Sequence, residues 1–120
     1  MSAKLDLVDF PIQRGDTYRL DLVFNDEKGV TDMRSKTVVV TLKIDRMIAD
    51  EDADIVVRVA LEADDSFAQQ GKAVAIIEKS KTSELIPFTT YFYAVRVEES
   101  GVKETFARTM VTGKLPVEDA

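Results

Sequence analysis

Residues 17–24 read TYRLDLVF, and their even positions carry only Tyr, Leu, Leu and Phe. The odd positions carry Thr, Arg, Asp and Val. Because successive side chains of a β-strand point to opposite faces of its sheet, this pattern predicts a half-buried strand with the even positions facing the core. The polar stretch 25–29 ends in Gly29 and predicts a turn after that strand.

The same two-residue period recurs along the chain in stretches rich in β-branched and aromatic residues. Such residues favour strands over helices. The turn at 98–101 predicts a hairpin between the strands that flank it. Pro11 suits the edge or end of a weaker first strand, because it cannot donate a ladder hydrogen bond. The further predicted strands cover residues 5–12, 36–44, 55–62, 72–79, 90–98 and 102–111.

These patterns predict an all-β fold with about seven to eight antiparallel strands, arranged as a sandwich or a barrel. The chain shows no long segment with a 3.6-residue period. We expect at most one short helical turn, near residues 81–86, capped by Thr82 or Ser83 and ended by Pro87. No linker or repeat divides the chain, so residues 1–120 are predicted to form a single domain.

The composition argues against several classes of function. The chain has no cysteine and no histidine, which removes the thiol nucleophile and the commonest general base and metal ligand. Its net charge is -6 and no Lys/Arg cluster is evident, so nucleic acid and anionic membrane surfaces are not expected partners. The six serines lack a histidine partner, and the scattered glycines form no phosphate-binding loop. We therefore predict no enzyme, no catalytic residues and no cofactor.

Two motifs invite a functional interpretation. Arg14-Gly15-Asp16 matches the tripeptide of integrin ligands, but a turn glycine between two strand segments is the much stronger explanation of this short match. Residues 45–65 are rich in acids, and Asp50-x-Asp52-x-Asp54 resembles the opening of a calcium loop. An EF-hand needs glycine at its sixth position and glutamate at its twelfth, where this chain has Ile55 and Leu61. No metal site is therefore predicted, although an irregular calcium site remains an alternative.

The last strand carries large apolar residues on unexpected positions. If the small and branched residues at its odd positions face inward, Phe106 and Met110 face outward, as Phe92 does on the neighbouring strand. Such an apolar patch is typical of a protein contact. The alternative is a bulge or a register shift near Gly113 that turns these side chains inward. Phe92, Phe106 and Met110 are thus the candidate contact residues.

The order of several short motifs resembles small β-sandwich domains of phage and prophage virion proteins, such as the N-terminal domain of siphophage baseplate upper proteins. Five motifs follow one another along the chain: an RGD-T-aromatic strand, a G-x-x-D turn, a T-x-x-L turn, a tyrosine-rich strand and a G-x-L-x-V tail. Residues 33–35, Met-Arg-Ser, depart from the usual Leu-Thr-Gly turn. The motifs begin at positions 14, 29, 82, 91 and 113.

This resemblance implies an immunoglobulin-like β-sandwich with a structural role in a phage tail or baseplate, and it implies no catalytic residues. We expect partners among other virion or tail structural proteins, with a homo-oligomer as one possibility. We expect the protein to be a virion component assembled in the cytoplasm of the host bacterium. The alternatives are a calcium- or carbohydrate-binding sandwich that uses the acidic loops 45–54 and 62–65, and a small enzyme with a carboxylate pair.

Overall fold

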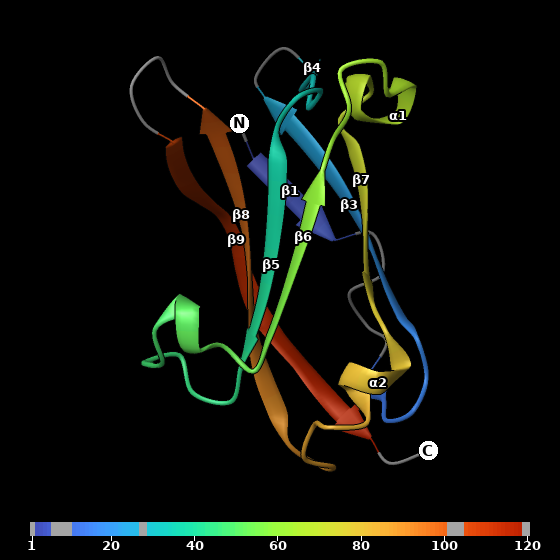
Figure 1. Ribbon diagram of the computed structural model, residues 1–120, viewed down its shortest axis with the longest axis vertical. Helices are drawn as coiled ribbons and strands as arrows, with labels where there is room; N and C mark the ends of the chain where they lie inside the picture. The colour runs from blue at the N-terminus through green and yellow to red at the C-terminus, as the bar shows by residue number, and fades with distance from the viewer. Residues whose placement is uncertain (1, 6–10, 27–28, 101–104, 119–120) are drawn as a thin grey trace.

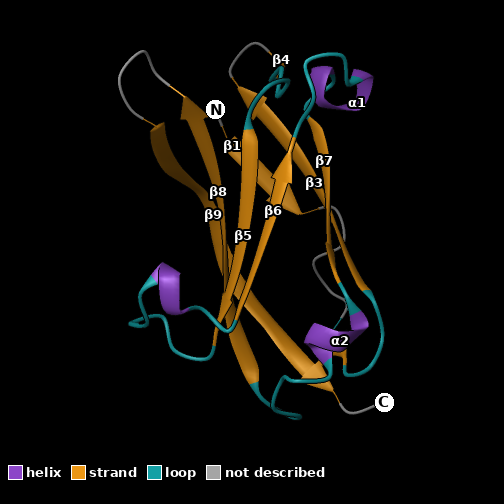
Figure 2. Ribbon diagram, viewed as in Figure 1, coloured by secondary structure: helices purple, strands orange, loops and turns teal. Residues whose placement is uncertain are grey.

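The computed structural model describes residues 2–5, 11–26, 29–100 and 105–118, which form two β-sheets joined by loops and short helical segments (Figures 1 and 2). The chain is therefore mostly β, as predicted. The strands are β1 (Ser2–Leu5), β2 (Ile12–Gln13), β3 (Tyr18–Asp26), β4 (Gly29–Val30), β5 (Thr37–Lys43), β6 (Ile55–Ala60), β7 (Lys72–Ile77), β8 (Thr90–Ser100) and β9 (Thr105–Glu118). The helical segments are η1 (Asp50–Asp52), α1 (Ser66–Gln69) and α2 (Lys79–Thr82).

The first sheet is built around β3, which pairs antiparallel with β1, β4 and β7. The predicted alternation of β3 is confirmed, because its even positions are buried and Arg19 is exposed. Full burial of such a side chain contributes roughly 1.5–3 kcal/mol. The buried residues of this strand are Tyr18, Leu20, Leu22 and Phe24.

The second sheet has the strand order β2-β9-β8-β5-β6. The predicted hairpin between residues 90–98 and the last strand is confirmed, since β8 and β9 pair antiparallel. β2, however, runs parallel to β9, with Ile12 opposite Val117. The expectation of antiparallel strands throughout is therefore wrong at this one edge. Ile12 and Val117, which are far apart in the sequence, are both buried in the core there.

Both sheets contribute to one apolar core. Leu20 and Leu22 of the first sheet belong to the same buried cluster as Val40, Tyr91 and Val95 of the second. Figure 1 shows β6 beside β7, where the two sheets approach each other along one edge. The strands β1 and β9 approach each other elsewhere in the molecule.

The number of strands agrees with the prediction, but the helical content does not. Seven strands have four residues or more, and β2 and β4 have two each. The expectation of at most one helical turn is wrong, because the described residues contain three. The turn expected near residues 81–86 overlaps α2, which spans Lys79–Thr82. The predicted cap at Thr82 or Ser83 is wrong, because the residue before this helix is Glu78 and Thr82 is its last residue. The helix α1 was not predicted. Its N-terminus is capped by the Asp65 carboxylate, which accepts hydrogen bonds from the backbone N–H groups of Phe67 and Ala68.

β5 departs from the simple alternation. Its inward residues Val38 and Val40 are buried, and so are the outward residues Val39 and Thr41. β5 lies between β6 and β8, so side chains of both neighbours flank its outer face. A central strand is thus enclosed on both sides, which an alternating pattern does not reveal.

The weak strand predicted for residues 5–12 overlaps the end of β1 and the beginning of β2. Residues 6–10 lie outside the described residues.

Candidate functional site

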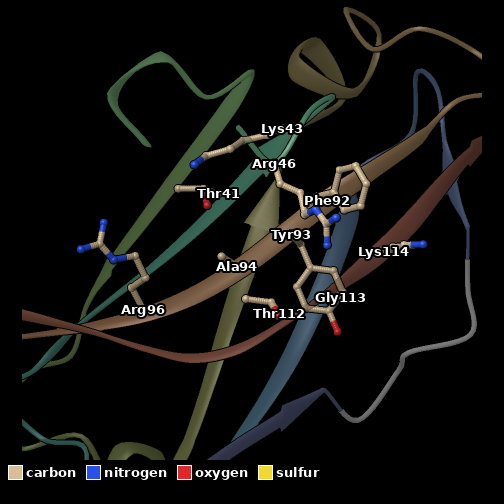
Figure 3. A pocket seen from close by; sticks show the side chains of 10 residues that line it. All are labelled: Thr41, Lys43, Arg46, Phe92, Tyr93, Ala94, Arg96, Thr112, Gly113 and Lys114. Carbon is tan, nitrogen blue, oxygen red and sulfur yellow. The ribbon is translucent and has the colours of Figure 1, made fainter. Parts of the chain in front are cut away.

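The outer face of the second sheet carries a groove of about 310 Å³ over β5, β8 and β9 (Figure 3). Its floor follows one row of cross-strand neighbours, in which Ala94 lies opposite both Thr41 and Thr112. Neighbours in such a row lie side by side on one face of the sheet. Because these three side chains are small, the row leaves a depression that crosses three strands. We call this depression the basic groove, for the charges described next.

One rim of the basic groove is the adjacent row, in which Phe92 lies opposite both Lys43 and Lys114. Arg46, in the connection after β5, reaches the same ring, with its guanidinium carbon 5.5 Å from the ring centroid. The Lys114 ammonium lies 5.7 Å from that centroid. Each cation–π contact contributes about 0.5–1 kcal/mol at an exposed site. Phe92 therefore helps to hold two cations at one rim.

All the charged side chains that line the basic groove are positive: Lys43, Arg46, Arg96 and Lys114. The whole chain has a net charge of -6, so this cluster runs against the overall composition. A groove lined by one sign of charge raises the local concentration of ions of the opposite sign. The arrangement suits a carboxylate or another anionic group.

The floor also holds a buried polar group. Thr41 is only 2% exposed, and its hydroxyl has no hydrogen-bond partner among the described residues. A buried hydroxyl without a partner costs about 1–3 kcal/mol. A group bound in the groove would give this hydroxyl a partner.

Gly113 lets the strand β9 pass close to the Tyr93 ring. A Cβ at Gly113 would lie 2.5 Å from the Tyr93 hydroxyl oxygen and 2.6 Å from two ring carbons. Glycine is therefore required where the ring crosses β9. Burial raises the pKa of Tyr93, so its hydroxyl stays protonated at neutral pH and is a poor general base.

The predicted contact residues fall in two groups. Phe92 is half-buried on the outer face and forms the rim just described. The side chains of Phe106 and Met110 lie outside the described part of the structure, so their contact role stays a prediction. The backbone pairing shows a register irregularity between Val95 and Arg96. The pairing of β8 with β9 thus contains the kind of bulge that was the alternative for this strand, and a bulge changes which positions share a face.

Three of the acids in residues 45–65 accept hydrogen bonds from nearby backbone N–H groups. The Asp54 carboxylate accepts the Ile44 N–H at 2.9 Å, and the Asp45 carboxylate accepts the Met47 N–H at 2.9 Å. Asp65 caps α1. Among the described residues, no group of three or more acids could hold a metal ion. The calcium alternative gains no support from this geometry.

The Arg14-Gly15-Asp16 turn is docked on α2. Thr82, which is fully buried, accepts the Gly15 N–H at 3.1 Å and donates its hydroxyl to the Asp16 carbonyl at 2.8 Å. Arg14 donates to the Ser83 carbonyl at 3.0 Å. Gly15 has φ of 86°, a left-handed conformation that favours glycine. These contacts give the tripeptide a structural role.

A second surface runs along the edge strands β6 and β7. Val56 and Ile76 line one depression there, and Phe67 and Val74 line the next. All four side chains are exposed, from 37% for Val74 to 67% for Phe67. We call this surface the apolar seam. Contiguous exposed apolar side chains are typical of protein contacts.

Neither surface was identified from the sequence. The basic residues of the groove come from β5, the loop after it, β8 and β9, and the strand register brings them together. The outward positions of Lys43 and Arg96 were readable from the alternation, but their neighbours were not. In the apolar seam, the outward position of Val56 was readable from the alternation, whereas the register of residues 72–79, which contain Val74 and Ile76, was ambiguous from the sequence.

Comparison with known proteins adds no identity. No protein-family model and no curated protein matches this chain. Within the described residues, no helix is both long and apolar enough to cross a membrane.

Proposed function

We propose that this chain is a non-catalytic structural module of a phage or prophage tail or baseplate, with an immunoglobulin-like sandwich fold. It acts through contacts with other tail proteins and is assembled in the cytoplasm of the host bacterium. The motif order described above supports the tail assignment. The observation that carries an assembly role is the apolar seam, Val56, Phe67, Val74 and Ile76.

The apolar seam has two features of a docking surface. Its side chains are apolar and adjacent, so covering them removes apolar area from water, at roughly 25 cal/mol per Å². Its two strands are also sheet edges, since β6 pairs with β5 and β7 pairs with β3 among the described residues. Edge strands present backbone groups that can pair with a strand from a partner. A tail protein that adds a strand or a loop there would cover both.

The basic groove does not favour catalysis. Its side chains are Lys, Arg, Thr, Phe and Tyr, with no carboxylate or imidazole among the lining residues. General acid–base work needs a group whose pKa lies near the working pH, and raising the pKa of Tyr93 moves it away from neutrality. The groove fits binding better than chemistry.

The proposal is tested by purifying particles from a culture that carries the gene and measuring this chain in them by quantitative mass spectrometry. We expect the chain in intact particles at a fixed ratio to tail proteins. Its recovery only in the soluble fraction would overturn the proposal.

A matched pair of variants then tests the apolar seam. Ile76 in the seam is 50% exposed and Ile86 outside it is 52% exposed. The variants Ile76→Asp and Ile86→Asp therefore replace apolar side chains of similar exposure. We expect Ile76→Asp to lower incorporation at least about tenfold, a change that corresponds to 1.4 kcal/mol of binding free energy. Ile86→Asp should be incorporated normally. Equal incorporation of both variants, with unchanged melting temperatures, would exclude the seam as the contact surface.

A further inference from the structure

The basic groove and the acidic surface of the same chain have complementary charges. Arg46 and Lys114, at the rim of the groove, form no ion pair with the described residues. Glu62 and Asp64, in the turn before α1, are exposed and likewise form no ion pair there. Each site therefore carries charge that the described residues do not neutralise.

The two sites lie far apart on the molecule. Figure 1 shows α1, which directly follows the acidic turn, at one end of the long axis. The loop that carries Arg46, between β5 and β6, lies toward the other end. Because the two sites lie toward opposite ends of a molecule that is 41 Å long, the turn does not line its own groove.

We propose that the basic groove receives the acidic turn 62–65 of a second copy of this chain, in a head-to-tail contact. The exposed Glu62 and Asp64 carboxylates pair with Arg46 and Lys114. A carboxylate oxygen at the floor accepts a hydrogen bond from the Thr41 hydroxyl, which is buried and has no partner among the described residues. The volume of about 310 Å³ accommodates one or two side chains of a turn.

A contact between unlike surfaces has a structural consequence. It leaves a free groove on one copy and a free turn on the other, so it continues until a ring closes or a linear array forms. This inference deepens the proposed tail function, since it names a partner for one surface. The apolar seam remains available for other tail proteins.

Light scattering coupled to size exclusion tests self-association of the full chain over a range of concentrations. We expect the mass to rise with concentration at low salt and to fall back at about 0.5 M salt, because exposed charges are then screened. A strict monomer at millimolar concentration and low salt would overturn the inference. The test on purified particles is independent, so the tail function can stand if self-association fails.

Charge reversal identifies the surfaces. Lys114→Glu and the double variant Glu62→Lys, Asp64→Lys should each weaken self-association at least about tenfold. Mixing the two variants should restore association, because the intact acidic turn of the first variant then meets the intact basic groove of the second. Lys79→Glu, an equal charge change at an exposed position outside the groove, is the control and should associate as the wild type does. Failure of the mixture to associate would contradict the pairing.

A synthetic peptide of residues 60–66 separates this occupant from other anions. In a nuclear magnetic resonance titration with this peptide, we expect the largest amide shift changes of the protein at Thr41, Ala94 and Thr112. The same titration of the Lys114→Glu variant should produce no such changes. Citrate and inorganic phosphate serve as comparison probes. If either of them shifts these residues while the peptide does not, the groove binds a small anion and the proposed occupant is wrong.

Discussion

Thr82 and Thr41 are the two buried polar residues of the described structure, and their surroundings differ completely. Thr82 joins α2 to the Arg14-Gly15-Asp16 turn, with its hydroxyl bonded on both sides. Thr41 lies under the basic groove, and its hydroxyl bonds to none of the described residues. A buried polar group that is satisfied stabilises the fold, whereas one that is not costs stability unless something binds it. Thr82 therefore belongs to a structural motif, and Thr41 to a candidate binding site.

The largest effect is expected at Thr82. Thr82→Val keeps the shape of the side chain but leaves the Gly15 N–H and the Asp16 carbonyl without their partner. We expect the free energy of unfolding to fall by about 1–3 kcal/mol, measured by urea denaturation. Thr90→Val, at an exposed strand position, is the control and should change little. A neutral Thr82→Val would mean that the turn is held by other contacts.

A smaller loss of stability is expected on substitution of Gly15. Its φ of 86° suits glycine, and an added Cβ would meet only the Ser83 hydroxyl, at 3.9 Å. Gly15→Ala therefore tests backbone strain without a clash, and should cost about 1 kcal/mol in thermal or chemical unfolding. Gly15→Asn should cost less, because asparagine tolerates the left-handed region. If Asn costs as much as Ala, strain is not the cause.

At Thr41 we expect a substitution to raise the free energy of unfolding rather than lower it. Thr41→Val removes a hydroxyl without a partner and keeps the volume, so we expect stability to rise by up to about 1 kcal/mol. The same variant should weaken binding at the basic groove, since the ligand loses a hydrogen bond. A loss of stability instead would show that the hydroxyl is already satisfied in the free protein.

The smallest effect on stability is expected at the rim. Lys114→Gln removes one cation from the Phe92 ring, a contact of about 0.5–1 kcal/mol at most. The melting temperature should shift little, while the salt dependence of self-association should decrease. A large drop in melting temperature would place Lys114 among the structural residues.

Many of the strands and turns could be predicted from short stretches of sequence. The alternation of residues 17–24 identified the buried face of β3 residue by residue, and the turn at 98–101 marked the β8–β9 hairpin. Short-range signals suffice there because side-chain direction in a strand follows a two-residue period. The helical segment α1 was missed although Asp65 offers a recognisable cap, because its helix is only four residues long.

Other features depend on which strands become neighbours. The parallel pairing of β2 with β9 joins residues more than 100 positions apart, and no local pattern predicts it. The burial of Val39 and Thr41 on an outward face arises because β5 lies between two other strands. The candidate contact at Phe92 was expected to be apolar, and its actual neighbours are cations.

The amino-acid order thus sets the strands, their inward faces and the turn chemistry, because each depends on residues within a few positions of one another. The basic groove exists only in the folded chain. Its floor, Thr41, Ala94 and Thr112, and its rim, Lys43, Phe92 and Lys114, are rows that cross three strands. Cross-strand register is fixed by packing of the whole sheet, so a one-residue slip would disperse the same charges over both faces.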